Sequence, residues 1–402
     1  MNESLDFALR TAGRVQSELL DVMKREYVGK DEVIDLLGIC LVAGENLFLL
    51  GPPGTAKSAL VRSLAAKLDG RVFDYLLTRF TEPSELFGPF DIRKLRDGDL
   101  LTNTEGMLPE ADIVFLDELL NANSAILNSL LMALNERIFR RGRETRKLGF
   151  VLTVGASNRL PEDDALAALF DRFLLRVRSD NVPAEMLTSV LEAGWQLQKS
   201  EASRGSAGNR IAIEELRAMQ SCIPLIDLGQ TRTVYVGLIN RLRHAGLEIS
   251  DRRAVRLQRL AAASAMMCGR SSVDVSDFWV MRYIWDTMEQ VEVLAKIVND
   301  TIKSSHAGSA TRVDADDESP EAQVSVHPRS VSMDAPNPAH LSRDLDQIDA
   351  LLASAGDDGH QKSWLRDRLS LLLSRVEWVQ QPDAREFLRG RIQSLMSIAA
   401  TS

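Results

Sequence analysis

Hydrophobic and polar residues change their spacing twice along the chain. From Leu5 to about Leu41, charged side chains are interleaved with leucines at helical spacing. Short apolar strands that alternate with helices are typical of a parallel sheet covered by helices on both faces, because both faces of such a sheet are buried. The pattern therefore predicts an α/β domain over residues 1–180, the N-terminal helix included. Its four apolar runs are Asn46–Leu50, Val72–Leu77, Ile113–Leu116 and Phe150–Gly155.

The strand pattern ends near Asp180, and helical spacing follows. Residues 181–303 are predicted to form an all-helical domain, because Ala, Leu, Glu and Arg dominate there. Residues 304–340 are rich in Ser, Ala, Asp and Pro and are predicted to be a linker. Residues 341–402 predict a helical C-terminal region with amphipathic helices at 345–352, 365–379 and 387–396. The helices expected before the linker are Pro183–Lys199, Ile213–Ser221, Thr231–Ala245, Asp251–Cys268 and Val275–Thr301.

Composition and charge narrow the class of protein. The chain has 402 residues, with 48 Lys and Arg against 57 Asp and Glu, and a formal net charge of −9. As a whole, such an acidic chain is not attracted to nucleic acid or anionic membranes. Its most apolar stretch, Leu36–Leu50, is interrupted by polar residues and is too short to span a bilayer. We expect a cytoplasmic protein without a membrane span, because the start does not resemble a signal peptide and the three cysteines are isolated: Cys40, Cys222 and Cys268.

The strongest chemical signal follows the first predicted strand. Residues 51–58 read Gly-Pro-Pro-Gly-Thr-Ala-Lys-Ser and lead into a helical segment, Ala59–Lys67. In a phosphate-binding loop, backbone N–H groups surround the phosphates, Lys57 neutralises the β- and γ-phosphates and the Ser58 hydroxyl ligates Mg²⁺. Ala56 stands where the motif has its last glycine, which fits if this residue keeps a negative φ. A lysine in the first helical turn opposes the helix dipole unless an anion lies there, which favours this interpretation over a plain Gly/Pro turn.

Two further strands end in polar residues that suit the same chemistry. The run Ile113–Leu116 leads into Asp117 and Glu118, at the edge where open α/β sheets bind ligands. Here Asp117 would hold Mg²⁺, and Glu118 would orient and polarise the attacking water. The run Phe150–Gly155 leads to Asn158, which would position that water, although asparagines at strand ends are also common turn residues.

In this order and spacing, the residues GPPGTAKS, IVFLDE, GASN and ALFDRF resemble an AAA+ ATPase. The segments ELFGPFDIRKL, GMLPEADIVFLDE, ILNSLLMALNER and ISDRRAVRLQRL resemble more narrowly the MoxR branch, nearest to the RavA type. The similarity runs from about Tyr27 to about Val293. It implies an AAA+ parallel sheet with helices on both faces, an all-helical lid and a small helical C-terminal region. No β-rich insertion follows the lid, which departs from the RavA pattern.

The resemblance assigns roles to matching positions around one nucleotide. ATP and Mg²⁺ are the implied cofactors, with Ser58 and Asp117 as metal ligands. Asp117 and Glu118 match Walker B, and Asn158 matches sensor 1. The implied nucleotide-binding residues are Val28 and Gly29 on the base side, beside Tyr27, and the loop and helix start Gly51, Pro52, Pro53, Gly54, Thr55, Ala56, Lys57, Ser58 and Ala59.

Two arginines complete the implied site. Arg172 matches an arginine finger that reaches a neighbour's γ-phosphate, and its alternative is a local pair with Asp171. Arg252 matches sensor 2 in the lid, with Arg253 as the alternative. Two arginines in the first turn after a Ser250 N-cap oppose the helix dipole, which is tolerable if one of them reaches a phosphate or if Glu248 and Asp251 compensate their charge.

These roles imply an assembly and a mode of action. A finger supplied in trans accelerates phosphoryl transfer by orders of magnitude, and a subunit whose finger is on its far side cannot complete its own site. The resemblance therefore implies a hexameric ring in which ATP hydrolysis at subunit interfaces drives chaperone-like remodelling of a protein partner. A protein with a von Willebrand factor A (vWA) domain is the expected partner. Two insertions, at 87–109 and 139–147, are the expected moving parts.

Two other functions stay open. The second insertion is densely basic, and a hairpin at this position in ring helicases follows DNA, so a DNA-translocating ring is the first alternative. No Tyr or Trp is interleaved to stack bases, which favours a protein partner over nucleic acid. A slow-turnover, ATP-dependent assembly scaffold is the second alternative. Zinc and His-triad sites are disfavoured because all five histidines lie outside the α/β domain. The basic cluster consists of Arg137, Arg140, Arg141, Arg143, Arg146 and Lys147.

Overall fold

The computed structural model divides the chain into two compact units, Met1–His327 and Pro328–Ser402. Within the described residues, no helix combines the length and the apolar character that a membrane span needs. The structure describes residues 2–91, 101–141, 144–161, 164–203, 210–310, 345, 348–349, 369 and 382–400.

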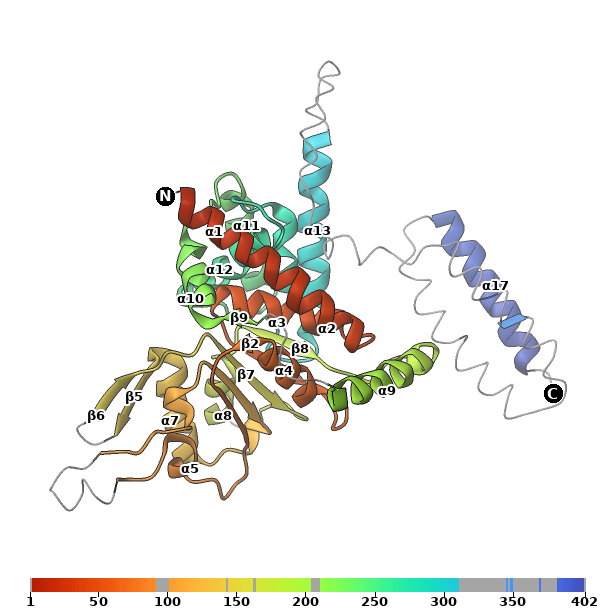
Figure 1. The fold of residues 1–402 in the computed structure, drawn as a ribbon. Helices are drawn as coiled ribbons and strands as arrows, with labels where there is room; N and C mark the ends of the chain where they lie inside the picture. The colour runs from red at the N-terminus through yellow and green to blue at the C-terminus, as the bar shows by residue number, and fades with distance from the viewer. Residues whose placement is uncertain are drawn as a thin grey trace. The chain divides into compact units, whose positions relative to one another are not determined.

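The first unit is built on a five-stranded sheet whose strands all run parallel (Figure 1). The spatial order is β3-β4-β7-β1-β8, so β4, β7 and β1 are internal and almost entirely buried. Their apolar runs form strands because both faces are covered, as the sequence predicts. The strands are β1 (Leu47–Leu50), β3 (Val72–Leu76), β4 (Ile113–Asp117), β7 (Leu152–Ser157) and β8 (Leu175–Arg178).

Sequence patterning missed the fifth strand, β8, because two arginines interrupt it. The Arg176 side chain is completely buried, with its guanidinium 4.3 Å from the centre of the Phe170 ring. Its Nη1 lies 2.8 Å from Oδ1 of Asp286. A charge in a buried strand needs such a partner. Because Asp286 is far away in the sequence, local pattern does not reveal the pairing.

Helices pack on both faces of the sheet (Figure 1). The first helix predicted from the leucine spacing is broken at Glu26, and the chain turns at Tyr27–Lys30 before α3 begins. The helices up to β8 are α1 (Asn2–Arg14), a π-helical stretch η1 (Val15–Leu20), α2 (Asp21–Glu26), α3 (Asp31–Ala43), α4 (Lys57–Ala66), α5 (Pro83–Phe87), α7 (Ser124–Glu136) and α8 (Asp164–Phe170), with 3₁₀ turns η2 (Leu108–Glu110) and η3 (Leu119–Asn121).

The region after β8 is mainly helical, as predicted. It also contributes β9 (Ile211–Ala212), which pairs in parallel with β2 (Leu68–Asp69), and its helices pack on α1 and α3. It therefore belongs to the same compact unit as the sheet, and its boundary at residue 181 stays a prediction. Its helices are η4 (Ala184–Met186), α9 (Leu187–Ser203), α10 (Ile213–Cys222), η5 (Ile223–Leu225), α11 (Thr231–His244), α12 (Asp251–Met267), η6 (Val275–Tyr283) and α13 (Gln290–Ala310).

The single helix predicted over Val275–Thr301 is wrong. The structure has a 3₁₀ helix, η6, followed by a break and then α13. At the start of α13 the Gln290 side chain holds the break in place, because its Oε1 accepts from the backbone N–H groups of Asp286 (2.7 Å) and Thr287 (3.3 Å), which precede the helix. Helix α13 continues to Ala310, past the predicted start of the linker at residue 304.

In the second unit, α17 (Pro382–Ala400) contains the third predicted tail helix. The two earlier tail helices fall largely outside the described residues, as does most of the predicted linker. Most of the large apolar residues described in this unit are buried, whereas Phe387 is exposed. The buried positions are Leu345, Ile348, Leu369, Leu388, Ile392 and Leu395.

Candidate functional site

A cleft of about 730 Å³ lies at the carboxyl end of the sheet, between the start of α4 and the end of β4. Its volume is in the range of about 300–1,000 Å³ that is typical of small-molecule sites. Most of the predicted phosphate loop and both Walker B carboxylates line it. The lining residues are Tyr27, Pro53, Gly54, Ala56, Lys57, Ser58, Ala59, Arg62, Ser63, Ala66, Asp117, Glu118 and Leu197.

The loop between β1 and α4 is anchored to the sheet from behind. Gly51 N–H donates to the Ser157 carbonyl at 3.1 Å, which continues the pairing of β1 with β7. A Cβ at Gly51 would lie 2.2 Å from the Ser179 carbonyl oxygen, so only glycine fits there. Gly54 has a φ of +83°, which glycine adopts without strain. The backbone geometry therefore requires glycine at position 51, because another backbone segment approaches closely, and favours it at position 54, because the turn is left-handed.

The same loop presents donors towards the cleft. The Lys57 ammonium is nearly buried and donates to the carbonyls of Gly51 (2.6 Å) and Pro52 (2.9 Å). Among the described residues, no backbone hydrogen bond engages the N–H groups of Gly54, Thr55 and Ala56. Free N–H groups beside a lysine and a helix N-terminus fit the oxygens of a phosphate chain.

Ala56 does not keep the negative φ that the sequence argument required. Its φ is 66°, because the loop enters α4 through a left-handed residue at the N-cap. For a residue with a Cβ this conformation costs about 1–2 kcal/mol. The alanine is thus a strained substitute for the motif's glycine.

Replacing Ala56 by Gly is therefore expected to stabilise the protein by about 0.5–1 kcal/mol, after subtraction of the larger unfolded-state entropy of glycine. Chemical denaturation monitored by circular dichroism measures this change. Ala59→Gly, in the first turn of the same helix, is the matched control and should destabilise by about 0.5–1 kcal/mol. Destabilisation by both substitutions would contradict the strain at Ala56.

Ser58 and Asp117 form the oxygen pair predicted to ligate Mg²⁺. Ser58 Oγ donates to Asp117 Oδ2 at 2.8 Å, and Asp117 Oδ1 accepts from the Glu118 N–H at 3.0 Å. The described residues contain no group of three or more His, Cys, Asp or Glu side chains placed to hold a metal. A hydroxyl and one carboxylate suit Mg²⁺, which usually takes few protein ligands and completes its shell with water and phosphate oxygens.

Glu118 follows β4 in a left-handed conformation with a φ of 50°. Desolvation raises the pKa of its carboxyl group, and the neighbouring charge of Asp117 raises it further. Two cations, Lys57 and Arg159, oppose this rise. The carboxylate is thus more basic than an exposed glutamate and remains at the cleft, as a group that polarises water requires.

Arg159 was missed by the sequence reasoning. Its Nη2 donates at 3.1 Å to Oδ1 of Asn121, the last residue of the helical turn that follows Glu118. The only signal in the sequence is its position next to Asn158, at the end of a strand that reaches the same sheet edge.

Arg159→Met is expected to move the acidic limb of the pH profile of kcat/KM for ATP to higher pH. In its predicted role Glu118 must be ionised to polarise water, and removing a cation that favours its ionised form raises its pKa further. Arg62→Met is the control, because Arg62 lines the same cleft but its Nε lies 2.6 Å from Asp74 Oδ2. If the acidic limb shifted with both variants, or with neither, the charge of Arg159 would not be what lowers the pKa of Glu118.

The base side of the cleft is only partly as predicted. Tyr27 lines it and donates its hydroxyl to the Ala59 carbonyl at 3.1 Å. Val28 and Gly29 are not among the lining residues, and Gly29 turns the chain with a φ of +74° beside Val182. Leu197, from α9, lines the cleft instead, and no local pattern indicated it.

The remaining predicted residues do not line the cleft of their own chain. Asn158 is exposed and follows Ser157, whose carbonyl holds Gly51, so it lies at the same sheet edge. Arg172 makes the local pair that the sequence left open, with Nη1 2.9 Å from Asp171 Oδ2. The roles of Asn158 as sensor 1 and of Arg172 as a finger stay predictions.

The two sensor 2 candidates differ sharply in environment. Arg253 is 6% exposed, and its Nη1 lies 3.1 Å from Asp286 Oδ2 and 3.9 Å from Asp171 Oδ1. Arg252 is exposed and makes no ion pair within the described part of the chain. Arg253 therefore holds α12 against the segment of Ile284 and Asp286. The role of Arg252 as sensor 2 stays a prediction.

The basic insertion forms the predicted hairpin, in which β5 (Ile138–Arg141) pairs with antiparallel β6 (Glu144–Lys147). Most of its described arginines are engaged within the protein. Arg137 lies over the Phe150 ring, Arg141 donates to the Gly88 carbonyl at 2.6 Å, and Arg146 lies 3.2 Å from Glu110. Arg143 lies outside the described residues.

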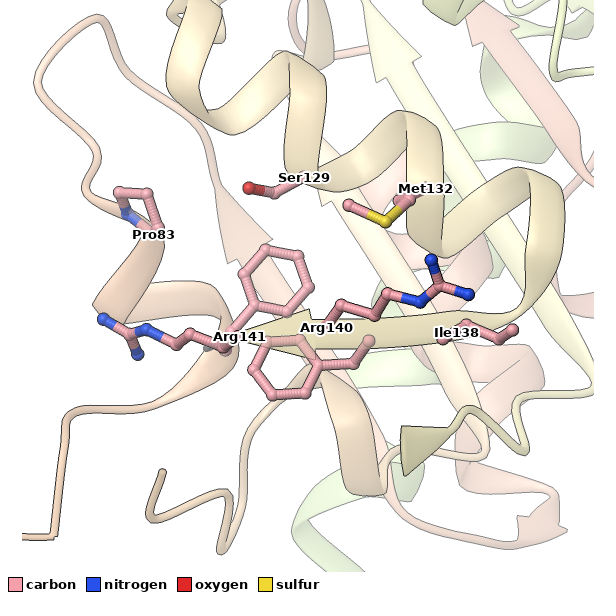
Figure 2. Close-up of a pocket in the computed structure, with 8 residues that line it drawn as sticks. Pro83, Ser129, Met132, Ile138, Arg140 and Arg141 are labelled. Atoms are coloured by element: carbon pink, nitrogen blue, oxygen red, sulfur yellow. The ribbon is translucent and has the colours of Figure 1, made fainter. Parts of the chain in front are cut away.

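Beside this hairpin lies a small cavity of about 80 Å³, too small for a nucleotide (Figure 2). Arg140 and Arg141 extend to opposite ends of it, and Met132 and Ser129 of α7 lie across from the strand (Figure 2). Phe87 and Phe139 stack there with ring centres 5.3 Å apart. The hairpin is therefore packed onto the first insertion rather than standing free.

Comparison with known proteins agrees with this geometry. Residues 14–221, just over half of the 402-residue chain, match the family model described as the MoxR domain of the MoxR–vWA–β-propeller ternary systems. The chain belongs to the MoxR family of AAA+ ATPases. Residues 233–298 of this MoxR-family ATPase match the model of an AAA lid domain.

Relatives and a solved structure extend over most of this MoxR-family ATPase. It is 34% identical over 277 residues to the uncharacterised protein MJ0079 of Methanocaldococcus jannaschii. The matched region covers 68% of this chain and 71% of that protein. A second uncharacterised protein of this organism, MJ0812, is 34% identical over 64% of this chain and 68% of its own length. The crystal structure of a candidate ATPase from Cytophaga hutchinsonii shares the fold, with a TM-score of 0.60 and 19% identity over 75% of this chain and 97% of that one. Nearness to the RavA type stays a prediction.

Proposed function

We propose that this MoxR-family protein binds ATP with Mg²⁺ in the cleft and hydrolyses it. The observation that carries the proposal is the convergence of Lys57, Ser58, Asp117 and Glu118 at one cleft beside a loop of free N–H groups. The loop and Lys57 would hold the phosphates, and Ser58 and Asp117 would hold the metal, which neutralises phosphate charge when bound. Glu118 would orient the attacking water and accept its proton.

The same proposal includes a ring of copies, as a hexamer. No arginine of the described chain other than Arg62 lines the cleft, and Arg62 is paired with Asp74. Arg172 is held by Asp171, near the start of α12, where Arg252 is exposed. A head-to-tail contact would bring these arginines to the cleft of the next copy, and repeated contacts of this type close into a ring.

We propose that hydrolysis drives chaperone-like remodelling of a protein partner. An exposed aromatic residue supports this: Phe80 is 90% exposed, yet its loop is fixed, because Asn123 Nδ2 donates to the carbonyls of Arg79 (3.2 Å) and Thr81 (2.8 Å). An apolar side chain held rigidly in solvent suits contact with a polypeptide. The family description also names vWA and β-propeller components, so a protein with a vWA domain is the proposed partner.

The two insertions would move as one unit in this action. Arg141 lies over the Phe90 ring with its guanidinium carbon 3.9 Å from the ring centre, and Glu144 accepts from the Thr102 N–H at 3.1 Å. These contacts link the hairpin to the first insertion. The first contact also engages Arg141, which a DNA-binding hairpin would need. It therefore favours a protein partner over DNA translocation. The three cysteines form no disulfide, in keeping with the proposed cytoplasmic location.

Steady-state ATP hydrolysis by the full chain tests the proposal and separates its rivals. We expect Mg²⁺-dependent turnover that rises when a vWA partner is added and does not respond to single- or double-stranded DNA. Stimulation by DNA that disappears in an Arg140→Ala, Lys147→Ala variant would favour the translocating ring. Tight ATP binding without turnover, with or without partner, would favour the assembly scaffold.

A further inference from the structure

Lys30 is a buried cation without a carboxylate partner. It is 7% exposed and lies directly before α3. Its Nζ donates to Ser179 Oγ at 3.2 Å and to the Asp180 carbonyl, and it makes no salt bridge within the described part of the chain. Burial lowers the pKa of its ammonium group, the nearby charge of Asp180 raises it, and the charge of Lys57 lowers it. Burying an ammonium group is costly, and hydrogen bonds to a hydroxyl and a carbonyl offset only part of that cost.

The hydrogen bonds of Lys30 connect three segments that surround the cleft. Lys30 ends the base-side turn that begins at Tyr27, and Tyr27 lines the cleft. Ser179 follows strand β8, and its Oγ in turn donates to the carbonyl of Thr55 in the phosphate loop at 2.9 Å. The Ser179 backbone also confines the loop at Gly51, where any Cβ would clash.

We propose that Lys30 is a positioning residue for nucleotide binding, which fixes the base-side turn and the phosphate loop relative to each other through Ser179. The inference rests on the proposed function of the cleft. Lys30 is not among the residues that line the cleft, so it acts through Ser179 and not by touching the nucleotide. A loop already held in its binding geometry loses less conformational entropy when the ligand binds.

Nucleotide affinity measured by titration with a fluorescent ATP analogue and with its ADP counterpart tests the proposal. Lys30→Met keeps the aliphatic stem and removes the donors, and we expect its Kd to rise about tenfold for both nucleotides. The equal effect follows because the loop, and not the γ-phosphate, is disturbed. At saturating ATP, kcat should change less than about twofold. Lys30→Arg, which keeps the donors, should recover most of the affinity.

A double-mutant cycle with Ser179→Ala identifies the route. Ser179→Ala keeps the charge of Lys30 and removes the link, so the double variant should bind no more weakly than the weaker single variant. Additive losses would show that Lys30 acts as an independent charge and would overturn the proposal. Normal ATP and ADP affinity in Lys30→Met would overturn it too.

Lys24→Met is the matched control, because Lys24 is a half-buried lysine that pairs with Asp35. It should lower thermal stability without changing nucleotide affinity. Circular dichroism of every variant confirms that the fold is retained. Absence of nucleotide binding in the wild type would refute the proposed function itself, whereas wild-type binding that Lys30→Met leaves intact refutes only this inference.

Discussion

Replacing Glu118 by Gln is expected to lower steady-state ATP turnover by about 10²–10⁴-fold, while ATP affinity stays close to that of the wild type. The carboxylate is the proposed proton-accepting group at the cleft, and its pKa is raised by desolvation and by Asp117. An amide of the same shape cannot accept the proton of the attacking water. Lys57 and the loop N–H groups, which are proposed to hold the phosphates, are unchanged. Coupled-enzyme turnover and nucleotide titration measure the two quantities separately.

Glu214→Gln is the control for the loss of one carboxylate. Glu214 is exposed on α10 and pairs with Arg217 at 3.5 Å, so its replacement should leave turnover unchanged. If Glu118→Gln also left turnover unchanged, the assignment of the water-polarising group would be wrong.

The Glu118→Gln form also offers the most direct route to the partner. A ring that holds ATP without hydrolysing it stays in its ATP-bound conformation, and partners that bind this conformation remain attached. Comparing proteins captured with ATP and with ADP should isolate those that depend on the nucleotide state. We expect a vWA-domain protein among them, and its absence in both states would contradict the proposed partnership.

Site residues that follow a recognisable apolar strand could be predicted from the sequence. Lys57, Ser58, Asp117 and Glu118 follow strands whose apolar runs are easy to see, and the parallel sheet brings their ends together. Their convergence follows from topology, because the carboxyl ends of parallel strands share one edge.

Residues whose role depends on contacts far away in the sequence could not be predicted. The buried Arg176 in strand β8 pairs with Asp286, and Lys30 is linked to the phosphate loop through Ser179. Ala56 could not be predicted fully for a different reason: the sequence shows that alanine replaces the motif's last glycine, but it does not show that φ at this position is positive.

Two residues at the cleft have a strained backbone, and the sequence does not predict the strain of either one. Ala56 and Glu118 are both left-handed although each carries a Cβ, and they are close in sequence to Ser58 and Asp117, which hydrogen-bond to each other. Such conformations persist only where the surrounding structure holds them in place, and they concentrate at functional sites. Glu118 directly follows strand β4, and Ala56 directly precedes helix α4.

Replacing Arg172 by Ala is expected to reduce ATP turnover by about 10³-fold or more with little change in ATP affinity. A finger stabilises charge that develops in the transition state, so it contributes more to kcat than to binding of the ground state. Arg14→Ala is the control, because Arg14 is a partly exposed arginine whose Nη1 lies 2.9 Å from Glu215, remote from the proposed site. Equal losses in the two variants would indicate a general structural effect.

Mixing variants decides whether Arg172 acts in trans. Lys57→Met lacks the phosphate-binding lysine but keeps Arg172, whereas Arg172→Ala keeps an intact cleft. Each alone should be inactive, and an equal mixture should recover about a quarter of wild-type turnover, since half of the clefts are intact and half of their neighbours carry the arginine. The double variant Lys57→Met, Arg172→Ala mixed with Arg172→Ala must recover nothing. Failure of the first mixture to recover, although the two variants co-assemble, would mean that Arg172 serves its own cleft, and its pair with Asp171 would then have to break within one chain.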